Sequence, residues 1–304
     1  MSWLLIVIIA HFLNAGVFIA DKYFLKRGFP NPLSYAFWIG LCSVVVLVLA
    51  PFGFSIPPIN QIIVALATGI VWLLAAIIFY TALYKGETSR VVPTVGGLIP
   101  LFTLGLSFIF LGERLSAKEL IAFCLLVGGG IILSLLVIKK TRIFASNQKI
   151  RLTKASVPAL AAALVFAVSF VMTKSVFMEQ SFISGLIWIR LGAALGALFL
   201  LIPSSFRRMI FKKGKRIKVK LFGLFLSAKG LGAVASLLIY WAIFLGSVTL
   251  VNALQGVQYL FLLLLAFFLF RKMPSLREQF NKKVLVQKIF AIILICLGLV
   301  VLVI

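Results

Sequence analysis

The sequence contains ten apolar segments, each about as long as a helix that crosses a bilayer. They lie roughly at residues 3–23, 33–53, 61–83, 91–111, 118–138, 156–177, 182–202, 221–243, 248–270 and 285–304. A helix needs about 20 predominantly apolar residues to cross the hydrocarbon core. The mean hydropathy is +1.21, and 63% of the residues are hydrophobic, which is more than a soluble domain needs for its core. The pattern predicts an all-α membrane protein with ten transmembrane helices.

The first segment and the cysteines indicate neither a cleaved signal nor a disulfide framework. The chain begins without a basic region, and its first apolar segment is long enough to cross the membrane, which favours a first transmembrane helix. Cys42, Cys124 and Cys296 each lie inside an apolar run, and the sequence has no C-x-x-C motif. We interpret them as small core residues. No cofactor and no metal site are expected.

The basic residues predict how the chain is oriented. Lys and Arg number 30 against 6 Asp and Glu, a formal charge of +24. The connectors after the first, third, fifth, seventh and ninth segments and their margins hold 25 of them, and those after the even segments hold three. Such clusters beside apolar segments indicate contacts with lipid headgroups, and we exclude nucleic-acid binding. The positive-inside rule places the basic connectors of this multi-pass protein on the cytoplasmic side of the cell (inner) membrane and both termini outside.

A basic linker around 139–154 divides the segments into two sets of five, and the sets resemble each other in sequence. A shift of 160 residues gives nine identities over 36 positions. The identities pair Ala75, Tyr80, Ala82, Gly86, Val91, Gly96, Leu104, Phe108 and Phe110 with Ala235, Tyr240, Ala242, Gly246, Val251, Gly256, Leu264, Phe268 and Phe270. Five crossings in each half reverse the direction of the second half. The pattern therefore predicts two inverted five-helix repeats, at 1–140 and 153–304, around a central cavity.

One stretch of the first half resembles a known transporter family. The run GETSRVVPTVGGLIPLFTLGLSFIFLGERLS at 86–116 resembles the fourth-helix region of the ten-helix, EamA-type branch of the drug/metabolite transporter superfamily. The second half has 271–275, RKMPS, where that branch has LGERL. The resemblance implies that the chain moves a small metabolite, such as an amino acid, a sugar, a nucleotide sugar or a phosphorylated compound. It also implies a central cavity and alternating access.

Two cations lie deep in the apolar segments. Arg190 is about 12 Å from the nearer end of its segment, which is too far for its side chain to reach the headgroups, and Lys229 is about as deep. All six acids fall in loops or at segment ends. A carboxylate or phosphate on a substrate is the simplest partner for these cations. Alternatively, they bind backbone carbonyls or water and stabilise the fold.

Other polar residues extend this candidate substrate site. Tyr240 follows Lys229 on one helical stripe, and Asn252, Gln255 and Tyr259 share one face of their segment. Hydrogen bonds between helices are an equally good interpretation of the last three.

The first and fourth segments supply the remaining candidates. His11 and Asn14 are spaced i, i+3 near the middle of the first segment, where His11 is either a proton relay or a neutral hydrogen-bonding residue. That segment has no membrane-embedded acid, which argues against proton-coupled export of cationic drugs. Pro93 and Pro100 give the fourth segment either a bend that serves a gate or a static kink.

Together these features predict a secondary transporter of an anionic or zwitterionic metabolite, such as an amino acid, a carboxylate or a phosphorylated compound. The alternatives are a flippase for a lipid-linked phosphate-bearing cargo and a non-transporting membrane scaffold. No H-E-x-x-H, paired intramembrane aspartates or G-x-S-x-G motif is present, so we expect no enzyme activity. The expected partners are a small-molecule substrate and membrane lipids, and the protein is expected to be a monomer or a homodimer.

Overall fold

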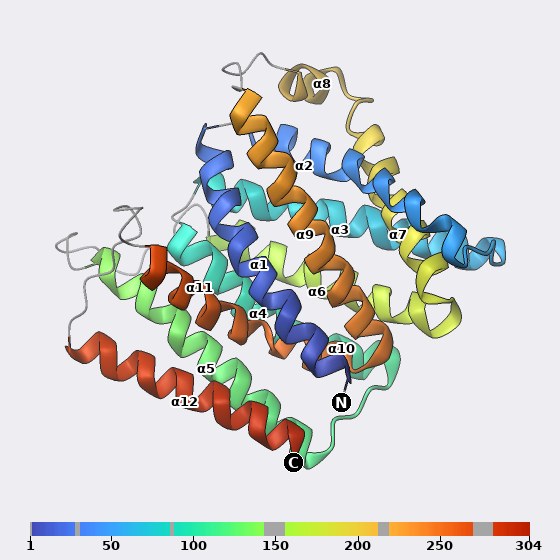
Figure 1. Ribbon diagram of the computed structural model, residues 1–304. Helices are drawn as coiled ribbons and strands as arrows, with labels where there is room; N and C mark the ends of the chain where they lie inside the picture. The colour runs from blue at the N-terminus through green and yellow to red at the C-terminus, as the bar shows by residue number, and fades with distance from the viewer. Residues whose placement is uncertain (1, 28–30, 86–87, 143–155, 212–218, 270–281) are drawn as a thin grey trace.

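The computed structural model describes residues 2–27, 31–85, 88–142, 156–211, 219–269 and 282–304 (Figure 1). These residues form twelve α-helices, one 3-10 helix and no strand. The elements are α1 (Ser2–Arg27), α2 (Pro32–Cys42), η1 (Ser43–Phe52), α3 (Ile59–Lys85), α4 (Thr88–Leu111), α5 (Ala117–Arg142), α6 (Ser156–Glu179), α7 (Phe182–Phe199), α8 (Ser204–Ile210), α9 (Val219–Leu245), α10 (Val248–Ala253), α11 (Gln255–Leu269) and α12 (Lys282–Val303). Within the described residues, seven helical segments are long and apolar enough to cross a membrane. The chain is therefore an all-helical protein with several candidate spans, as predicted.

Three predicted segments differ in detail from the structure. The segment predicted at 33–53 consists of α2 followed by the 3-10 helix η1, which contains Pro51, a residue without a backbone donor. The segment predicted at 248–270 is interrupted at Leu254, between α10 and α11. The short helix α8 follows α7 in a connector where no helix was predicted. A hydropathy window averages over such breaks and does not detect them.

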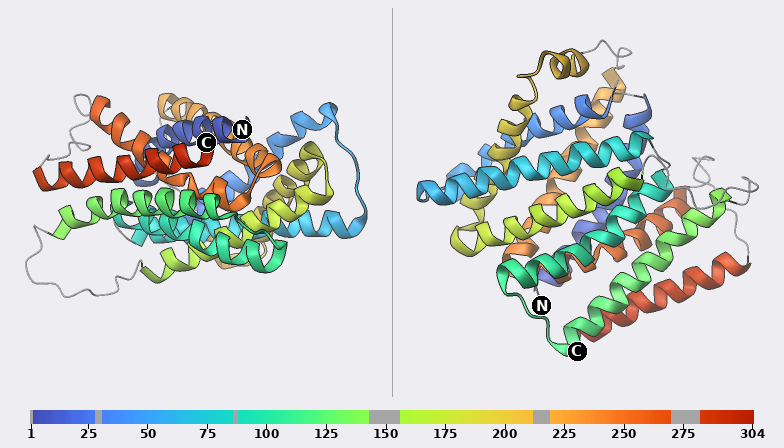
Figure 2. Two further views of the ribbon diagram at one scale, coloured as in Figure 1. Left: turned by 90° about the horizontal axis from the view of Figure 1, so that it is seen from below. Right: turned by 180° about the vertical axis from the view of Figure 1, so that it is seen from behind.

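The helices run alternately between two ends of the bundle. The first turn of α1 and the last turn of α12 lie at the same end, at the bottom of Figure 1, whereas α1, α5 and α7 all end at the upper and left-hand side (Figures 1 and 2). Helices α5 and α12 pack side by side along one flank. The connectors that follow α1, α5 and α7 thus leave from one end of the bundle, which agrees with the predicted separation of basic connectors from the termini.

Two glycines bring α3 and α7 into backbone contact. A Cβ atom on Gly69 of α3 would overlap the backbone oxygen of Ile189 in α7. A Cβ on Gly192 of α7 would overlap the backbone of Leu66 in α3. Small residues at such a crossing let two apolar helices approach closely, which is how helices gain packing energy in lipid. We call this contact the glycine crossing.

The LGERL motif of the first half makes a connection to the second half. Gly112 ends α4 with φ of 65°, a left-handed conformation that suits glycine. Glu113 then accepts a hydrogen bond from the Thr249 hydroxyl of α10 (2.8 Å), and Thr249 also contacts the Ser107 hydroxyl (2.7 Å). These bonds hold the start of α10 against the end of α4.

The end of α9 is held by a lysine from α6. Lys174 Nζ donates to the backbone oxygens of Ile243 (2.9 Å) and Gly246 (2.7 Å). The last carbonyls of a helix have no partner within the helix, and a cation placed there also interacts favourably with the helix dipole. Lys174 is therefore a capping residue for α9.

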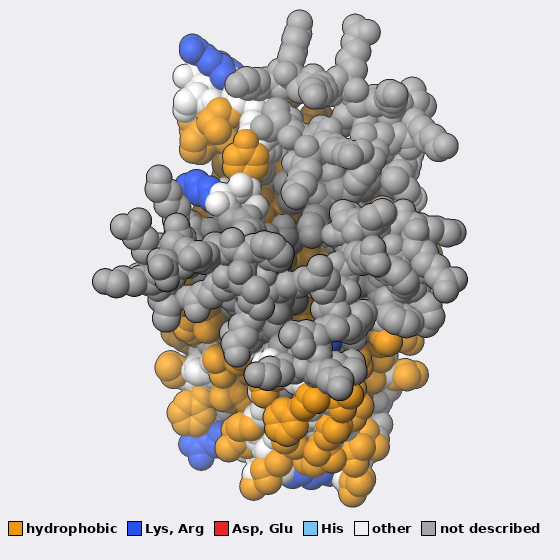
Figure 3. Space-filling model, turned by 90° about the vertical axis from the view of Figure 1, so that its left-hand side faces the viewer, with side chains coloured by type: hydrophobic (Ala, Val, Ile, Leu, Met, Phe, Trp, Pro, Cys, Tyr) orange, Lys and Arg blue, Asp and Glu red, His pale blue; other side chains and the backbone are white. Residues whose placement is uncertain are grey.

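The outside of the bundle is apolar where it is described. On α12, Val286, Ile289, Phe290, Ile293 and Leu297 are exposed. In Figure 3, the described side chains on the lower part of the face shown are mostly hydrophobic. Such a surface suits lipid contact.

The three cysteines are free and exposed, so the prediction that they are core residues is wrong. Cys124 and Cys296 lie on α5 and α12, whereas Cys42 lines an internal cavity. Apolar neighbours in sequence could not distinguish a core position from a surface that faces lipid.

Candidate cavity between the two halves

A cavity of about 1190 Å³ lies between helices of both halves of the chain. Its walls come from α1, α2, η1, α3 and α4 on one side and from α6, α7, α9, α10 and α11 on the other. The sequence repeat predicts a cavity in this place. Its volume suits a ligand of drug size or larger, since sites for such ligands measure about 300–1,000 Å³.

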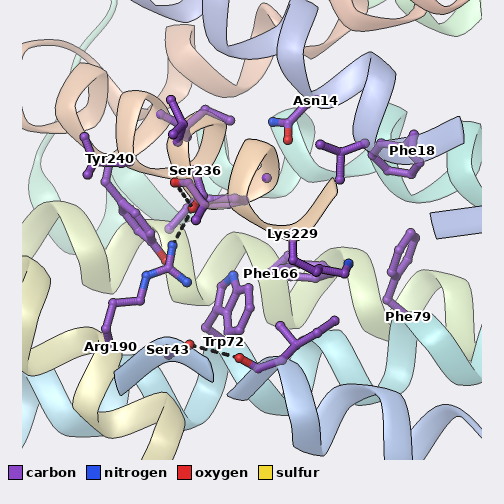
Figure 4. A pocket seen from close by; sticks show the side chains of 18 of the residues that line it. Asn14, Phe18, Ser43, Trp72, Phe79, Phe166, Arg190, Lys229, Ser236 and Tyr240 are labelled. Carbon is purple, nitrogen blue, oxygen red and sulfur yellow. Dashed lines mark hydrogen bonds between the residues drawn. The ribbon is translucent and has the colours of Figure 1, made fainter. Parts of the chain in front are cut away.

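Arg190 is held in the cavity wall by aromatic rings and one hydroxyl. It lies near the middle of α7 and reaches toward α9 (Figure 4). Its guanidinium carbon is 5.2 Å from the centre of the Trp72 ring and 4.8 Å from that of Tyr240. Its Nη2 donates to the Ser236 hydroxyl at 2.8 Å, and that hydroxyl donates in turn to the Ala233 carbonyl. These neutral contacts orient the guanidinium and leave its positive charge uncompensated by a carboxylate.

Lys229 enters the same cavity from α9. Its amine lies over the Tyr35 ring of α2, 4.7 Å from the ring centre. Figure 4 shows its side chain on the other side of Trp72 from the Arg190 guanidinium. No Asp or Glu is present among the described residues that line the cavity. The described lining therefore carries two positive charges and no negative one.

A wall of uncharged polar side chains comes from α1, α10 and α11. His11, Asn14, Asn252, Gln255 and Gln258 all line the cavity. His11 Nδ1 donates to Gln258 Oε1 at 3.2 Å, and Asn252 Nδ2 donates to its own helix. The structure thus brings seven of the eight predicted substrate-binding residues to one cavity. They are His11, Asn14, Arg190, Lys229, Tyr240, Asn252 and Gln255.

Tyr259 and Pro100, one of the two predicted gating prolines, lie outside the cavity lining. Tyr259 is buried between α11 and α4, where its hydroxyl donates to the Val92 carbonyl at 3.1 Å. It occupies the space that a side chain on Gly96 would need. Pro100 lies beside the same contact, outside the cavity lining. Pro93 belongs to α4, but its side chain is outside the described part of the structure.

Several aromatic lining residues could not be singled out from the sequence. Phe18, Phe79, Phe166 and Phe170 of α1, α3 and α6 line the cavity. In the sequence they are four of 29 phenylalanines, mostly in apolar runs, and no spacing distinguishes a Phe that faces a cavity from one that faces lipid. Their role depends on tertiary packing alone.

Comparison with known proteins agrees with this architecture. Residues 1–135 match the EamA-like transporter family. The matched part includes the LGERL motif and is less than half of the chain, so the likeness to this family is one of the first half. With the apolar helices it indicates a multi-pass membrane protein.

Two individual proteins are also similar. The uncharacterized protein MJ1333.1 of Methanocaldococcus jannaschii is 29% identical over 134 residues, which cover 42% of this chain and 93% of that protein. A protein of known crystal structure superposes with a TM-score of 0.69 at 19% identity, over 99% of this chain and 98% of the other. The second likeness shows that the two chains share a fold along their whole length.

Proposed function

We propose that the chain is a secondary transporter that moves a small organic anion through the cavity by alternating access. One observation carries the proposal: Arg190 is oriented at the cavity wall by two aromatic rings and a hydroxyl, with no acid in the described lining. A guanidinium that is half-buried among apolar helices has a desolvation cost that a bound anion offsets. A carboxylate or a phosphate matches its paired donors.

The lining favours an anion over a zwitterion. An ammonium group would need a carboxylate or several carbonyl oxygens to replace its water, and the described lining offers only neutral side chains beside the two cations. Amides, hydroxyls and the imidazole along α1, α9 and α11 can bind hydroxyl or carbonyl groups of the same substrate. The preferred class is therefore a carboxylate or phosphorylated metabolite without an amine.

The packing of the helices supports two inverted repeats, residues 1–140 and 153–304. In this repeat α3 corresponds to α9, and α6 to α1. Helix α3 packs against α6, and α9 packs against α1, as an inverted pair requires. The similar protein from M. jannaschii has about half the length of this chain, which suits a five-helix unit.

Two corresponding pairs of helices beside the cavity make unequal contacts, and this difference supports alternating access. Helix α3 is closed onto α7 by the glycine crossing, whereas the corresponding helices α9 and α2 do not pack along each other over their described residues. Cys42 of α2 and Lys229 of α9 line the space between them. An inverted repeat can exchange such unequal contacts between its halves, and that exchange would move the opening from one membrane face to the other.

The test is anion-dependent stabilisation of the purified protein. We expect phosphate esters or carboxylates to raise the melting temperature of the wild type, because a ligand that binds the folded state stabilises it. Arg190→Ala should lose this response, and Arg190→Lys, which keeps the charge but not the paired donors, should retain part of it. Flux of the stabilising anion into proteoliposomes would then establish transport.

Arg114→Ala is the matched control, because Arg114 is exposed between α4 and α5, outside the cavity. It should respond to anions like the wild type. If only neutral compounds stabilise the wild type, or if folded Arg190→Ala keeps the full response, the proposal is wrong.

A further inference from the structure

One side of the cavity is bordered by exposed apolar side chains of η1 and α9. Val45 and Val48 of η1 line the cavity, and each is 70% exposed. Val234 of α9 also lines it and is 52% exposed. Over their described residues, η1 and α9 do not pack along each other, and Figure 1 shows η1 ending at the right-hand edge of the bundle, well above the end of α9. We call the gap bordered by these three valines the side opening.

The side opening lies at a depth where the protein meets hydrocarbon. Its two borders belong to two of the candidate membrane spans, Pro32–Phe52 and Leu226–Leu245. Residues 31–58 and 230–247, which include these borders, contain no Asp, Glu, Lys or Arg. A surface that meets lipid tails has to be free of charged groups, because charge is costly in hydrocarbon. Both borders therefore suit an opening toward the lipid tails of the bilayer.

Arg190 lies beside the side opening. Its Nη2 donates to Ser236, two residues beyond Val234 on α9. Two residues are about 3 Å along a helix, so the guanidinium is bound at nearly the same depth as the border of the opening. In the view of Figure 4, the guanidinium lies between Ser236 of α9 and Ser43 at the start of η1. An acid bound by Arg190 therefore has an apolar way out of the cavity next to it.

We infer that the transported anion is an amphiphile of the bilayer. Arg190 binds its carboxylate or phosphate, and its alkyl chain passes through the side opening to the lipid tails. This inference rests on the proposed function and narrows its substrate class. The chain packs against the exposed valines, and the cavity volume of about 1190 Å³ leaves room for several methylene groups beside the acid.

The experiment varies the length of the alkyl chain at constant charge. Binding of ethyl, butyl, hexyl and octyl phosphate to the full-length protein is measured in nanodiscs of neutral lipid, and binding to empty nanodiscs is subtracted. Propanoate, pentanoate, heptanoate and nonanoate form a parallel carboxylate series. Each methylene group removed from water raises affinity by up to about fourfold, which corresponds to about 0.8 kcal/mol. We expect the longest member of a series to bind about a hundredfold more tightly than the shortest.

A polar chain is the matched control for the ligand. The phosphate ester of triethylene glycol has about the length of octyl phosphate, but its ether oxygens keep it in water. It should therefore bind about as weakly as ethyl phosphate.

Variants locate the alkyl chain at the side opening. Val48→Trp and Val234→Trp narrow the opening and should weaken octyl phosphate about tenfold more than ethyl phosphate. Val300→Trp is the matched control, because Val300 is exposed on α12, outside the cavity lining. All three valines are exposed, so the larger ring does not disturb the core. Arg190→Ala should weaken every member of both series, since all of them share an acidic group.

The outcomes separate the inference from the proposed function. If the short anions bind through Arg190 but affinity does not rise with chain length, the inference is wrong and the proposed function stands. The inference is also wrong if Val48→Trp and Val234→Trp keep the full gain of octyl phosphate, because the chain then stays inside the cavity. It is wrong again if folded Arg190→Ala binds octyl phosphate like the wild type. If no member of either series binds, both fail.

Discussion

Helices α3 and α9 have corresponding places in the proposed repeat and the same length of 27 residues, yet they make opposite contacts. Helix α3 touches α7 through the backbone at Gly69 and Gly192. The corresponding positions of α9 and α2 hold Lys229 and Cys42, and each of these four residues is ten positions beyond the first residue of its helix. Lys229 reaches across to Tyr35 of α2. A lysine side chain therefore lies between α9 and α2, whereas glycines let α3 and α7 touch.

The two halves therefore have corresponding helices, but the corresponding pairs α3–α7 and α9–α2 do not come into backbone contact equally readily. A glycine pair permits backbone contact, whereas a lysine keeps the helices apart and needs its charge compensated. The residues at these four positions therefore favour the arrangement in which α3 and α7 are in contact and α9 stands away from α2.

The largest expected effect comes from disrupting the glycine crossing. Gly69→Ala should lower the free energy of unfolding by about 3 kcal/mol or more, because the new methyl group would meet the backbone oxygen of Ile189, which cannot rotate away. Thermal unfolding in detergent and the monodisperse fraction on size-exclusion chromatography measure the loss.

Gly105→Ala in α4 is the matched control for that variant. A Cβ on Gly105 meets nothing within 4 Å, and alanine favours a helix over glycine, so stability should stay equal or rise slightly. Equal losses in the two variants would show that the crossing has no special role.

The second prediction concerns the C-terminal end of α9, which Lys174 caps. Lys174→Met should lower the free energy of unfolding by about 2 kcal/mol, because the carbonyls of Ile243 and Gly246 lose a charged donor. Chemical denaturation of the variant beside Lys118→Met, which removes an exposed lysine, measures the difference. A loss of the same size in both variants would contradict the capping role.

The comparison also shows how far the sequence alone could lead. The apolar segments predicted the helices, and the depth of Arg190 and Lys229 predicted two cavity residues, because burying a charge in lipid is so costly that it needs a special environment. The sequence could not tell that Tyr259 packs against Gly96 while Gln255, one turn earlier, faces the cavity. Both are polar residues on one helical face, and both approach Gly96 of α4, but only Tyr259 is buried against the α4 backbone, where it donates to the Val92 carbonyl.

The glycine crossing could not be predicted from the sequence either. Gly69 and Gly192 are two of 23 glycines, and several others have open space around them. What distinguishes the pair is the approach of another backbone, and that approach depends on how α3 and α7 pack in the bundle. The contrast with Lys229 and Cys42 becomes visible only once the helices of the two halves are matched in space.

The smallest expected effect comes from replacing Lys229 of α9 by glycine, the residue that α3 has at the corresponding position. This variant tests the contrast between the two helix pairs most directly. In a background with Cys124→Ala and Cys296→Ala, Cys42 is the only cysteine left, and it is exposed in the cavity. Lys229→Gly should allow α9 to approach α2 and bury Cys42, so that labelling by a soluble maleimide slows about tenfold, which corresponds to about 1.4 kcal/mol in favour of closure. Lys229→Ala removes the same charge but keeps a Cβ where glycine has none, so its Cys42 should stay reactive. If alanine slows labelling as much as glycine does, the charge of Lys229 keeps the helices apart. If neither variant slows labelling, the gap between α2 and α9 does not depend on Lys229. The contrast between Lys229 and the glycine crossing then does not determine which pair of helices stands apart.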